Sequence, residues 1–306
     1  MSPAAAVAGP RGRSAGPLAS RLRAFERYFA SVLPPEGIEP RNLHEAMRYA
    51  ALAPGKRLRP LLVLTACEAV GGSWRRALPA AAAVECVHAF SLVHDDLPAL
   101  DDDDYRRGRA TTHRKYGEAL AILAGDALLA LAFQEVARLG ERGVPSRRVV
   151  EASQWLAYCT GSHELIAGQV LDLETEGRVA NEAMVREIDV RKTGALMSAA
   201  LRLGGLAGEA GDHQLDLLGV AGRHLGLAFQ IHDDLLNRRS SLGRLGKRAG
   251  TDQRRGKATY PRAVGERAAR VQAEQSIDLA LANLSTLGPR CRNLARLVCA
   301  MATRER

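Results

Sequence analysis

Residues 81–107 read AAAVECVHAFSLVHDDLPALDDDDYRR, an apolar stretch followed by six aspartates within ten residues. The apolar part predicts a buried helix. At helical pitch Asp95 and Asp102 share a face and Asp101 does not, so we expect Pro98 to distort the turn. Carboxylates at the end of a buried helix require cations, and oxygen ligands suit Mg²⁺ that also binds substrate phosphates. Arg106 and Arg107 follow, which favours a metal-bound diphosphate over the alternative, a solvated acidic surface.

A second acidic pair follows another apolar stretch. Residues 229–235 read FQIHDDL and resemble FSLVHDDL at residues 90–97. The likeness is too short to show a duplication. It does place two acidic clusters in comparable settings, each at the end of an apolar helix.

Segments that carry lysine add positive charge suited to phosphate. Residues 55–60 (GKRLRP) follow a break and open a helix, where free N–H groups favour phosphate. Lys192 lies in an apolar helical stretch, where a lysine is costly unless it meets an anion. Lys247 and Lys257 lie in a segment rich in Gly, Ser and charge. The chain has only five lysines, and all but Lys115 lie in these segments, as expected where a compact charge must meet a phosphate oxygen.

The composition of the chain bounds its fold. Of 306 residues, 46% are hydrophobic and 4% aromatic, which favours helix over sheet and excludes general disorder. Apolar periodicity predicts helices over residues 61–70, 78–97, 118–139, 146–176, 181–203 and 213–236, with a long loop over 237–260. Since no linker divides the chain, we expect one all-α domain of about ten helices over residues 21–306, after a disordered leader at residues 1–20.

Several functional classes are disfavoured. The net charge of +9 does not predict nucleic-acid binding, because the basic runs are short and lack interleaved aromatic residues. The five cysteines lack a C-x-x-C pair and indicate free thiols in a reducing cytosol rather than a zinc site. The first twenty residues lack the apolar core of a signal peptide. The most apolar run, residues 77–93, is interrupted by Pro79, Glu85 and His88, so we expect no stable membrane insertion and a cytoplasmic protein.

Together these segments resemble the short-chain trans-prenyltransferases, or polyprenyl synthases, and most closely the bacterial farnesyl diphosphate synthases. The resemblance rests on GKRLRP (55–60), the stretch at 81–107, AGDA (124–127), Gly168-Gln169, KTGA (192–195), GLAFQIHDD (226–234) and residues 245–261, in the family's order and approximate spacing. It implies an all-α bundle around a central cavity, the isoprenoid synthase fold, usually as a homodimer. It also implies head-to-tail condensation of isopentenyl diphosphate with dimethylallyl or geranyl diphosphate to give farnesyl diphosphate.

The resemblance also implies which residues form the site. Three Mg²⁺ ions, with Mn²⁺ as a substitute, would be held by Asp95 and Asp101 of the first acidic cluster and Asp233 of the second, with Asp96 and Asp102 close by. The allylic diphosphate would be bound by Arg106, Lys192, Thr193, Gln230, Lys247 and Lys257. Isopentenyl diphosphate would be bound by Gly55, Lys56, Arg59, His88 and Arg107. A lone histidine is by default a core residue, but His88 precedes Asp95 by seven residues, which favours the site.

The chemistry accounts for these residue types. Breaking the allylic C–O bond leaves pyrophosphate, and divalent cations with Lys and Arg stabilise its developing charge. Asp95, Asp101, Arg106, Lys192 and Asp233 would therefore be the catalytic residues. No nucleophilic side chain or protein base is required, because the proton is lost to the departing pyrophosphate.

Two features bear on the product and on activity. Phe90 and Ser91 lie roughly 6–7.5 Å down the helix from Asp95, and a bulky Phe90 would floor the cavity and limit the product to fifteen carbons. Geranyl and geranylgeranyl diphosphate synthases are the alternatives. The family's second acidic motif is usually Asp-Asp-x-x-Asp, but here it ends in Asn237, which offers Mg²⁺ an oxygen without charge. We expect weaker metal binding there, and a non-catalytic partner subunit of such a synthase remains an alternative.

Overall fold

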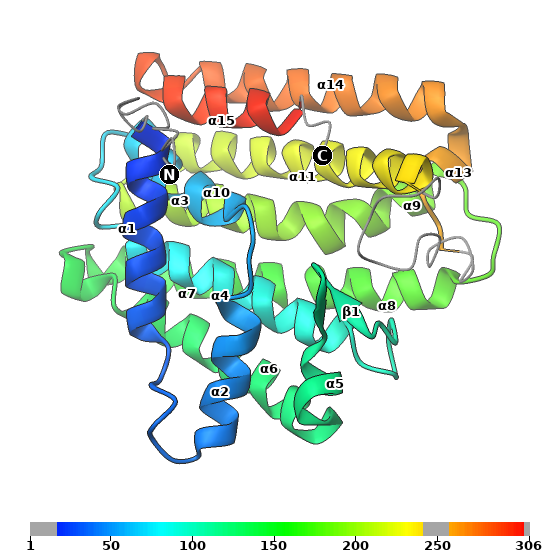
Figure 1. Cartoon of the computed structure of the whole chain (residues 1–306). Helices are drawn as coiled ribbons and strands as arrows, with labels where there is room; N and C mark the ends of the chain where they lie inside the picture. The colour runs from blue at the N-terminus through cyan, green and yellow to red at the C-terminus, as the bar shows by residue number, and fades with distance from the viewer. Residues whose placement is uncertain (1–16, 241–256, 303–306) are drawn as a thin grey trace, which may run out of the picture.

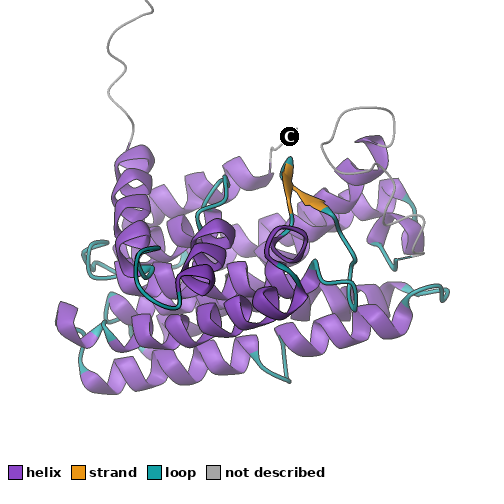
Figure 2. Cartoon of the chain, turned by 60° about the horizontal axis from the view of Figure 1, so that its bottom comes forward, coloured by secondary structure: helices purple, strands orange, loops and turns teal. Residues whose placement is uncertain are grey.

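The computed structural model of the chain describes residues 17–240 and 257–302, and these residues form an all-α bundle as predicted. A small antiparallel hairpin is the one sheet in the described part (Figure 2). The helices are α1 (Pro17–Val32), α2 (Arg41–Ala51), α3 (Leu58–Ala69), α4 (Leu78–Asp95), α5 (Thr112–Tyr116), α6 (Glu118–Ala137), α7 (Ser146–Thr160), α8 (Leu165–Thr175), α9 (Glu182–Asp189), α10 (Ala195–Ala207), α11 (Asp212–Ser240), α13 (Tyr260–Val264), α14 (Glu266–Ser285) and α15 (Arg292–Ala302). The hairpin strands are β1 (Tyr105–Arg106) and β2 (Arg109–Ala110).

Helix α4 is buried along most of its length and packs against α6, α3 and α10. Its first half carries the run Ala80–Ala83, and each of these alanines is 0% exposed. Small side chains let neighbouring helices approach closely, which explains how a chain poor in aromatic residues builds a dense core.

Some predicted boundaries require correction. The predicted helix over residues 146–176 is two helices, because α7 ends at Thr160 and an extended Gly161 precedes the turn into α8. Helix α1 begins at Pro17, inside the predicted leader, because Phe25 and Phe29 bury their rings in the core. Helix α11 continues to Ser240, into the predicted loop.

Residues 77–93 were expected to be the most apolar run, but another helical segment of the described residues passes a length and composition test for a membrane span. By length and composition alone, residues Glu118–Arg142 could cross a membrane, and 44% of their most apolar window is buried inside the protein. A core helix of a soluble protein passes the same test. Here the buried side of α6 packs against α4 through small residues such as Ala124 and Gly125.

The C-terminal ends of α4 and α11 lie at the same end of the bundle, beside α8, α9 and the hairpin (Figure 1). The first acidic cluster follows α4, and the second lies in the last third of α11. The fold therefore brings the two clusters to one end of the molecule.

Candidate active site

The loop after α4 turns the first acidic cluster back onto the helix end. The N–H of Asp101 donates to the carbonyl of Asp95 at 2.7 Å, and the N–H of Asp103 donates to that of Asp96 at 3.2 Å. Asp102 has a left-handed φ of 45° and donates to the carbonyl of Leu97 at 3.0 Å. The last carbonyls of α4 thus receive donors that the helix cannot supply. The helix ends at Asp95, as the distortion expected from Pro98 requires, and the backbone hydrogen bonds show in addition that Asp101 returns to Asp95.

Arg106 pairs with the buried carboxylate of Asp96, which is 3% exposed. Its Nε lies 2.7 and 2.9 Å from the two carboxylate oxygens. A second contact from this guanidinium reaches Asp103 at 3.7 Å. Because Arg106 belongs to β1 and Asp96 follows α4, this ion pair fixes the hairpin to the end of α4.

Two predicted lysines join the first acidic cluster to α8. Lys257 Nζ lies 2.8 Å from Asp101 Oδ1 and 3.9 Å from Asp172 Oδ2. Lys192 Nζ lies 2.7 Å from the same oxygen of Asp172. The result is a continuous Asp101–Lys257–Asp172–Lys192 series of ion pairs, which we call the lysine–aspartate chain.

Asp172 is a site residue that the sequence analysis missed, and Gln169 was quoted there only as part of a motif. Gln169 Nε2 donates to Asp95 Oδ1 at 2.6 Å, one turn before Asp172 on the same face of α8. A carboxylate and an amide three residues apart in the otherwise apolar stretch 165–173 were the available signal.

The carboxylates control the charge of these lysines. Burial acts to lower the pKa of Lys192, but Asp95, Asp172 and Asp101 outweigh it and the pKa is raised. The pKa of Lys257 is raised in the same way, since Asp101 and Asp172 outweigh burial and the charge of Lys192. Both ammonium groups are therefore charged at neutral pH. The finding agrees with the expectation that a lysine in this apolar stretch must meet an anion.

Three glycines let backbones meet around Lys192. Residues Val190–Gly194 form a π-helix between α9 and α10. A Cβ on Gly168 would lie 2.5 Å from the Lys192 backbone nitrogen, and one on Gly226 would lie 2.3 Å from Gly194 Cα. Real Cβ atoms do not approach this closely. Glycine at these positions therefore allows α8 and α11 to pack directly on the π-helix that positions Lys192.

Polar contacts link this π-helix to the second acidic cluster. Thr193 Oγ1 donates to Gln230 Oε1 at 2.9 Å, and Gln230 Nε2 donates to Asp234 Oδ1 at 3.0 Å. The N–H of Tyr260 donates to the other oxygen of Asp234 at 3.2 Å. The predicted ligands Thr193 and Gln230 thus lie together, and Asp234 joins α11 to α13. The partly buried Asp233 precedes Asp234 on α11.

Asp189, the last residue of α9, is a buried acid that the sequence analysis did not single out. It is 6% exposed. Burial, then the charges of Asp234 and Asp172, raise its pKa well above the ordinary value, and Lys192 acts in the opposite direction. An aspartate between Ile188 and Val190 was the signal available in the sequence.

Two of the residues predicted to bind isopentenyl diphosphate, Arg59 and Arg107, lie near a third, His88. Burial, followed by the positive charges of Arg59, Arg107, Arg106 and Arg57, lowers the pKa of His88 well below its ordinary value. A Cβ on Gly55 would lie 2.6 Å from an Arg107 guanidinium nitrogen, so Gly55 allows this arginine to approach. A neutral imidazole among several guanidinium groups is a favourable setting for an anion.

Arg57, which was not predicted as a site residue, is structural. It precedes α3 with a left-handed φ of 46°. Its guanidinium donates to the buried Glu85 at 2.7 Å and to the carbonyl of Ala53 at 2.9 Å. These contacts fix the turn that carries Gly55 and Lys56 to the start of α3, where both are exposed.

The predicted ligands therefore form two neighbouring groups, with one residue outside the described range. Lys247 lies in residues 241–256, which the structure does not describe. Arg106 joins the two groups, because it pairs with Asp96 and also lies near His88. Among the described residues no three acidic, histidine or cysteine side chains lie close enough together to hold a metal ion by themselves. The carboxylate oxygens present fit Mg²⁺ that is also bound by substrate phosphates. One of them, the buried Asp189 Oδ2, accepts no hydrogen bond from a described residue.

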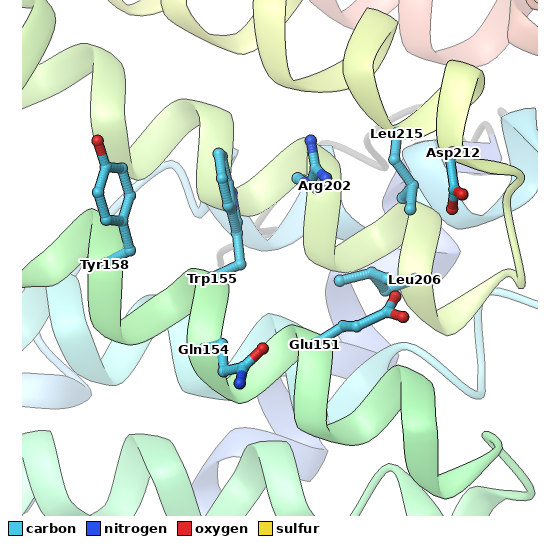
Figure 3. A pocket seen from close by; sticks show the side chains of 8 residues that line it. All are labelled: Glu151, Gln154, Trp155, Tyr158, Arg202, Leu206, Asp212 and Leu215. Atoms are coloured by element: carbon cyan, nitrogen blue, oxygen red, sulfur yellow. The ribbon is translucent and has the colours of Figure 1, made fainter.

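A separate pocket of about 580 Å³ lies between α7, α10 and the start of α11 (Figure 3). In it the Arg202 guanidinium stacks on the ring of Trp155 at 4.3 Å and pairs with Asp216. Its lining includes none of the predicted site residues. The lining residues are Glu151, Gln154, Trp155, Tyr158, Arg202, Leu206, Asp212 and Leu215.

Comparison with known proteins identifies the family. The polyprenyl synthetase model matches residues 40–286. The chain belongs to this family. It is 47% identical over 231 residues to geranylgeranyl pyrophosphate synthase 4 of Arabidopsis thaliana, covering 74% of this chain and 61% of the relative. It is 46% identical over 230 residues to the heterodimeric geranylgeranyl pyrophosphate synthase large subunit 2 of the same plant, covering 74% and 60%.

A solved structure shows that the whole fold is shared. The apo structure of a FPP/GFPP synthase from Zymomonas mobilis is 35% identical with a TM-score of 0.82, covering 94% of this chain and 97% of that one. By contrast, the chain spans only about three-fifths of the length of the two plant relatives. The predicted family and fold are confirmed. The curated relatives named here are geranylgeranyl rather than farnesyl diphosphate synthases, so the predicted closeness to farnesyl enzymes is not shown.

Proposed function

We propose that the chain is a prenyl diphosphate synthase that elongates an allylic diphosphate with isopentenyl diphosphate. The observation that carries the proposal is the lysine–aspartate chain beside the end of α4. A metal diphosphate carries positive charge on the metal and negative charge on the phosphates. The lysine–aspartate chain can bind both, because carboxylates bind divalent cations and ammonium groups bind phosphate oxygens. Magnesium bound to the diphosphate withdraws charge from the leaving group.

Different residues of the site would bind the metal ions, the departing pyrophosphate and the second substrate. Asp95, Asp101 and Asp233 would hold the metal ions. Lys192 and Lys257 supply fixed positive charge where the pyrophosphate departs, so the developing negative charge is stabilised without rearrangement of solvent. The second substrate would bind near His88, with its diphosphate on Arg59 and Arg107. Its double bond would then attack the allylic cation, and the proton would pass to the departing pyrophosphate.

For the product, the comparisons favour twenty carbons over the fifteen expected from Phe90. One structural observation supports the longer product. Ser91 lies four residues before Asp95 on the same face of α4 and is small. Phe90 instead shares a face with His94, with ring centroids 5.0 Å apart, and His94 packs against Gly125 of α6. The bulk of Phe90 is thus directed toward α6.

A fifteen-carbon product is the second candidate. Phe90 is 4% exposed and lies within the main core cluster. The similar Zymomonas structure is that of a FPP/GFPP synthase, and this name supports the fifteen-carbon candidate. Analysis of the dephosphorylated products after incubation with isopentenyl and dimethylallyl diphosphates and Mg²⁺ tests both candidates.

We also propose that α6 pairs with a second copy of the chain. Its outer face carries Ile122 and Leu123, which are 43% and 55% exposed, together with Ala119 and Ala130 at helical spacing. Asp126 lies on the same face and is also exposed. Exposed large apolar side chains with polar residues beside them are typical of protein interfaces. One similar plant protein is named as the large subunit of a heterodimer, which shows that a relative pairs with another subunit. Sedimentation of the purified chain separates a homodimer from a monomer.

A further inference from the structure

Asp189 holds a buried acceptor that no described residue uses. Its side chain is 6% exposed, and Oδ2 has no hydrogen-bond partner. A buried carboxylate without a partner is expensive, so such a group in a native structure calls for an explanation.

The charged neighbours of Asp189 belong to the candidate site. They are the carboxylates of Asp234 and Asp172 and the ammonium of Lys192. Lys192 already donates to Asp172 at 2.7 Å. Asp234 accepts hydrogen bonds from Gln230 and Tyr260 on its two oxygens. Asp189 therefore adds a third carboxylate beside Asp172 and Asp234. The ammonium groups of Lys192 and Lys257 already pair with Asp172 and Asp101, so the described residues leave this group of carboxylates favourable to an added cation.

The second acidic cluster is short of one charge on its own face. Asp233 and residue 237 are one helical turn apart on α11, so their side chains share a face. Residue 237 is Asn, which provides an oxygen but no negative charge. A divalent cation held at Asp233 therefore meets one carboxylate from this face of α11.

We propose that Asp189 compensates for the negative charge missing at residue 237. The magnesium ion held at Asp233 favours the ionised form of Asp189, and the carboxylate then accepts a hydrogen bond from a water molecule of that ion. Magnesium keeps several of its waters in protein sites, so a carboxylate can act on it through water. Asp189 is then a positioning residue for the metal diphosphate. This inference rests on the proposed function.

The test uses binding of inorganic pyrophosphate rather than turnover. The Mg²⁺ concentration that gives half-maximal pyrophosphate binding is measured by calorimetry for the wild type and for Asp189→Asn, Asn237→Asp and the double variant. Loss of a carboxylate that acts through water typically weakens metal binding by about tenfold to a hundredfold. We expect Asp189→Asn to raise the required Mg²⁺ by about tenfold. Asn237→Asp should lower it, and the double variant should return toward the wild type.

Thermal melting without ligand separates this role from a structural one. Asp189→Asn removes carboxylate repulsion, so its melting temperature without Mg²⁺ should equal or exceed that of the wild type. Asp216→Asn is the matched control, because Asp216 also lies on α11 but pairs with Arg202, outside the candidate site.

Three results would overturn the inference. They are an unchanged Mg²⁺ requirement in Asp189→Asn, a lowered melting temperature without ligand, and an unchanged requirement in Asn237→Asp. A wild-type chain that binds no pyrophosphate at any Mg²⁺ concentration contradicts the proposed function itself, and the inference with it.

Discussion

The ammonium of Lys192, on the π-helix, lies 2.7 Å from Oδ2 of Asp172 on α8. Lys257 approaches the same oxygen at 3.9 Å and reaches Asp101 at 2.8 Å. One carboxylate thus sets the position of two lysines that come from distant parts of the chain. The proposed diphosphate site depends on this spacing of point charges.

Replacement of Lys192 by Arg should therefore lower turnover about tenfold to a hundredfold although the charge is kept. The planar guanidinium is wider than an ammonium group and cannot take the same place between Asp172 and a phosphate oxygen. Steady-state release of pyrophosphate measures the effect. Lys115→Arg is the control, because Lys115 is exposed and stacks on Tyr49 and Tyr116. Equal activity of the two variants would show that the geometry at Lys192 is unimportant.

Replacement of Gly168 by Ala should lower the free energy of unfolding by about 1–3 kcal/mol, as overpacking does in a tight core. Helix propensity alone predicts a gain, since Ala is the better helix former. The loss is expected because the new Cβ would lie 2.5 Å from the Lys192 nitrogen. Urea denaturation measures it, with Gly37→Ala as the control because nothing lies within 4 Å of that position. A more stable Gly168→Ala protein would contradict the close packing of α8 on the π-helix.

Replacement of Ser91 by Phe should shorten the main product from twenty to fifteen carbons. A bulky side chain would then project from the face of α4 that carries Asp95. Chromatography of the dephosphorylated products reports the chain length, and Ser91→Ala should leave it unchanged. Phe90→Ala should cost about 3–5 kcal/mol of stability through the cavity it leaves. A longer product from Phe90→Ala, with none shortened by Ser91→Phe, would favour the fifteen-carbon candidate.

Stability should fall in mild acid because of His88. Burial and the surrounding arginines lower its pKa in the folded chain well below 6.5, whereas in the unfolded chain it keeps a pKa of about 6.5. The unfolded chain therefore binds the proton more readily, and stability is lost as the pH falls below about 6.5 toward the folded-state pKa. The contribution of one such group is at most about 1.4 kcal/mol per pH unit.

Urea denaturation between pH 7.5 and 5 checks this dependence. His88→Gln should show a shallower loss of stability with falling pH than the wild type. His213→Gln should behave as the wild type, because His213 is exposed at the start of α11. An unchanged slope in His88→Gln would mean that another group causes the loss.

The sequence predicted those features that depend on hydrophobic periodicity or on the chemical type of a single residue. The apolar run before Asp95 predicted a buried helix, and the mismatch between Asp95 and Asp101 predicted a distortion at Pro98, which agrees with the end of the helix at Asp95. The cost of Lys192 in an apolar stretch predicted an anionic neighbour, which is Asp172.

The site features that the sequence did not predict depend on contacts between segments that are distant along the chain. The local signals at Asp172 and Asp189 were weak, because each lies two residues from a glutamate, Glu174 and Glu187 respectively, and the pattern alone does not separate a buried acid from a surface one. Only the packing of α8 and α9 around the π-helix shows that they meet Lys192. The direction of the Phe90 side chain also could not be predicted from the sequence. Its spacing of five residues from Asp95 gives its position along α4, but not which neighbouring helix its ring packs against.

The most direct test of the account is incubation of the purified chain with isopentenyl diphosphate, dimethylallyl diphosphate and Mg²⁺, followed by chromatography of the dephosphorylated products. The account predicts elongated prenyl alcohols up to twenty carbons, stoichiometric pyrophosphate, and loss of both when the metal is chelated. A folded protein that forms no elongated product under these conditions would contradict the proposed activity and favour a non-catalytic partner subunit.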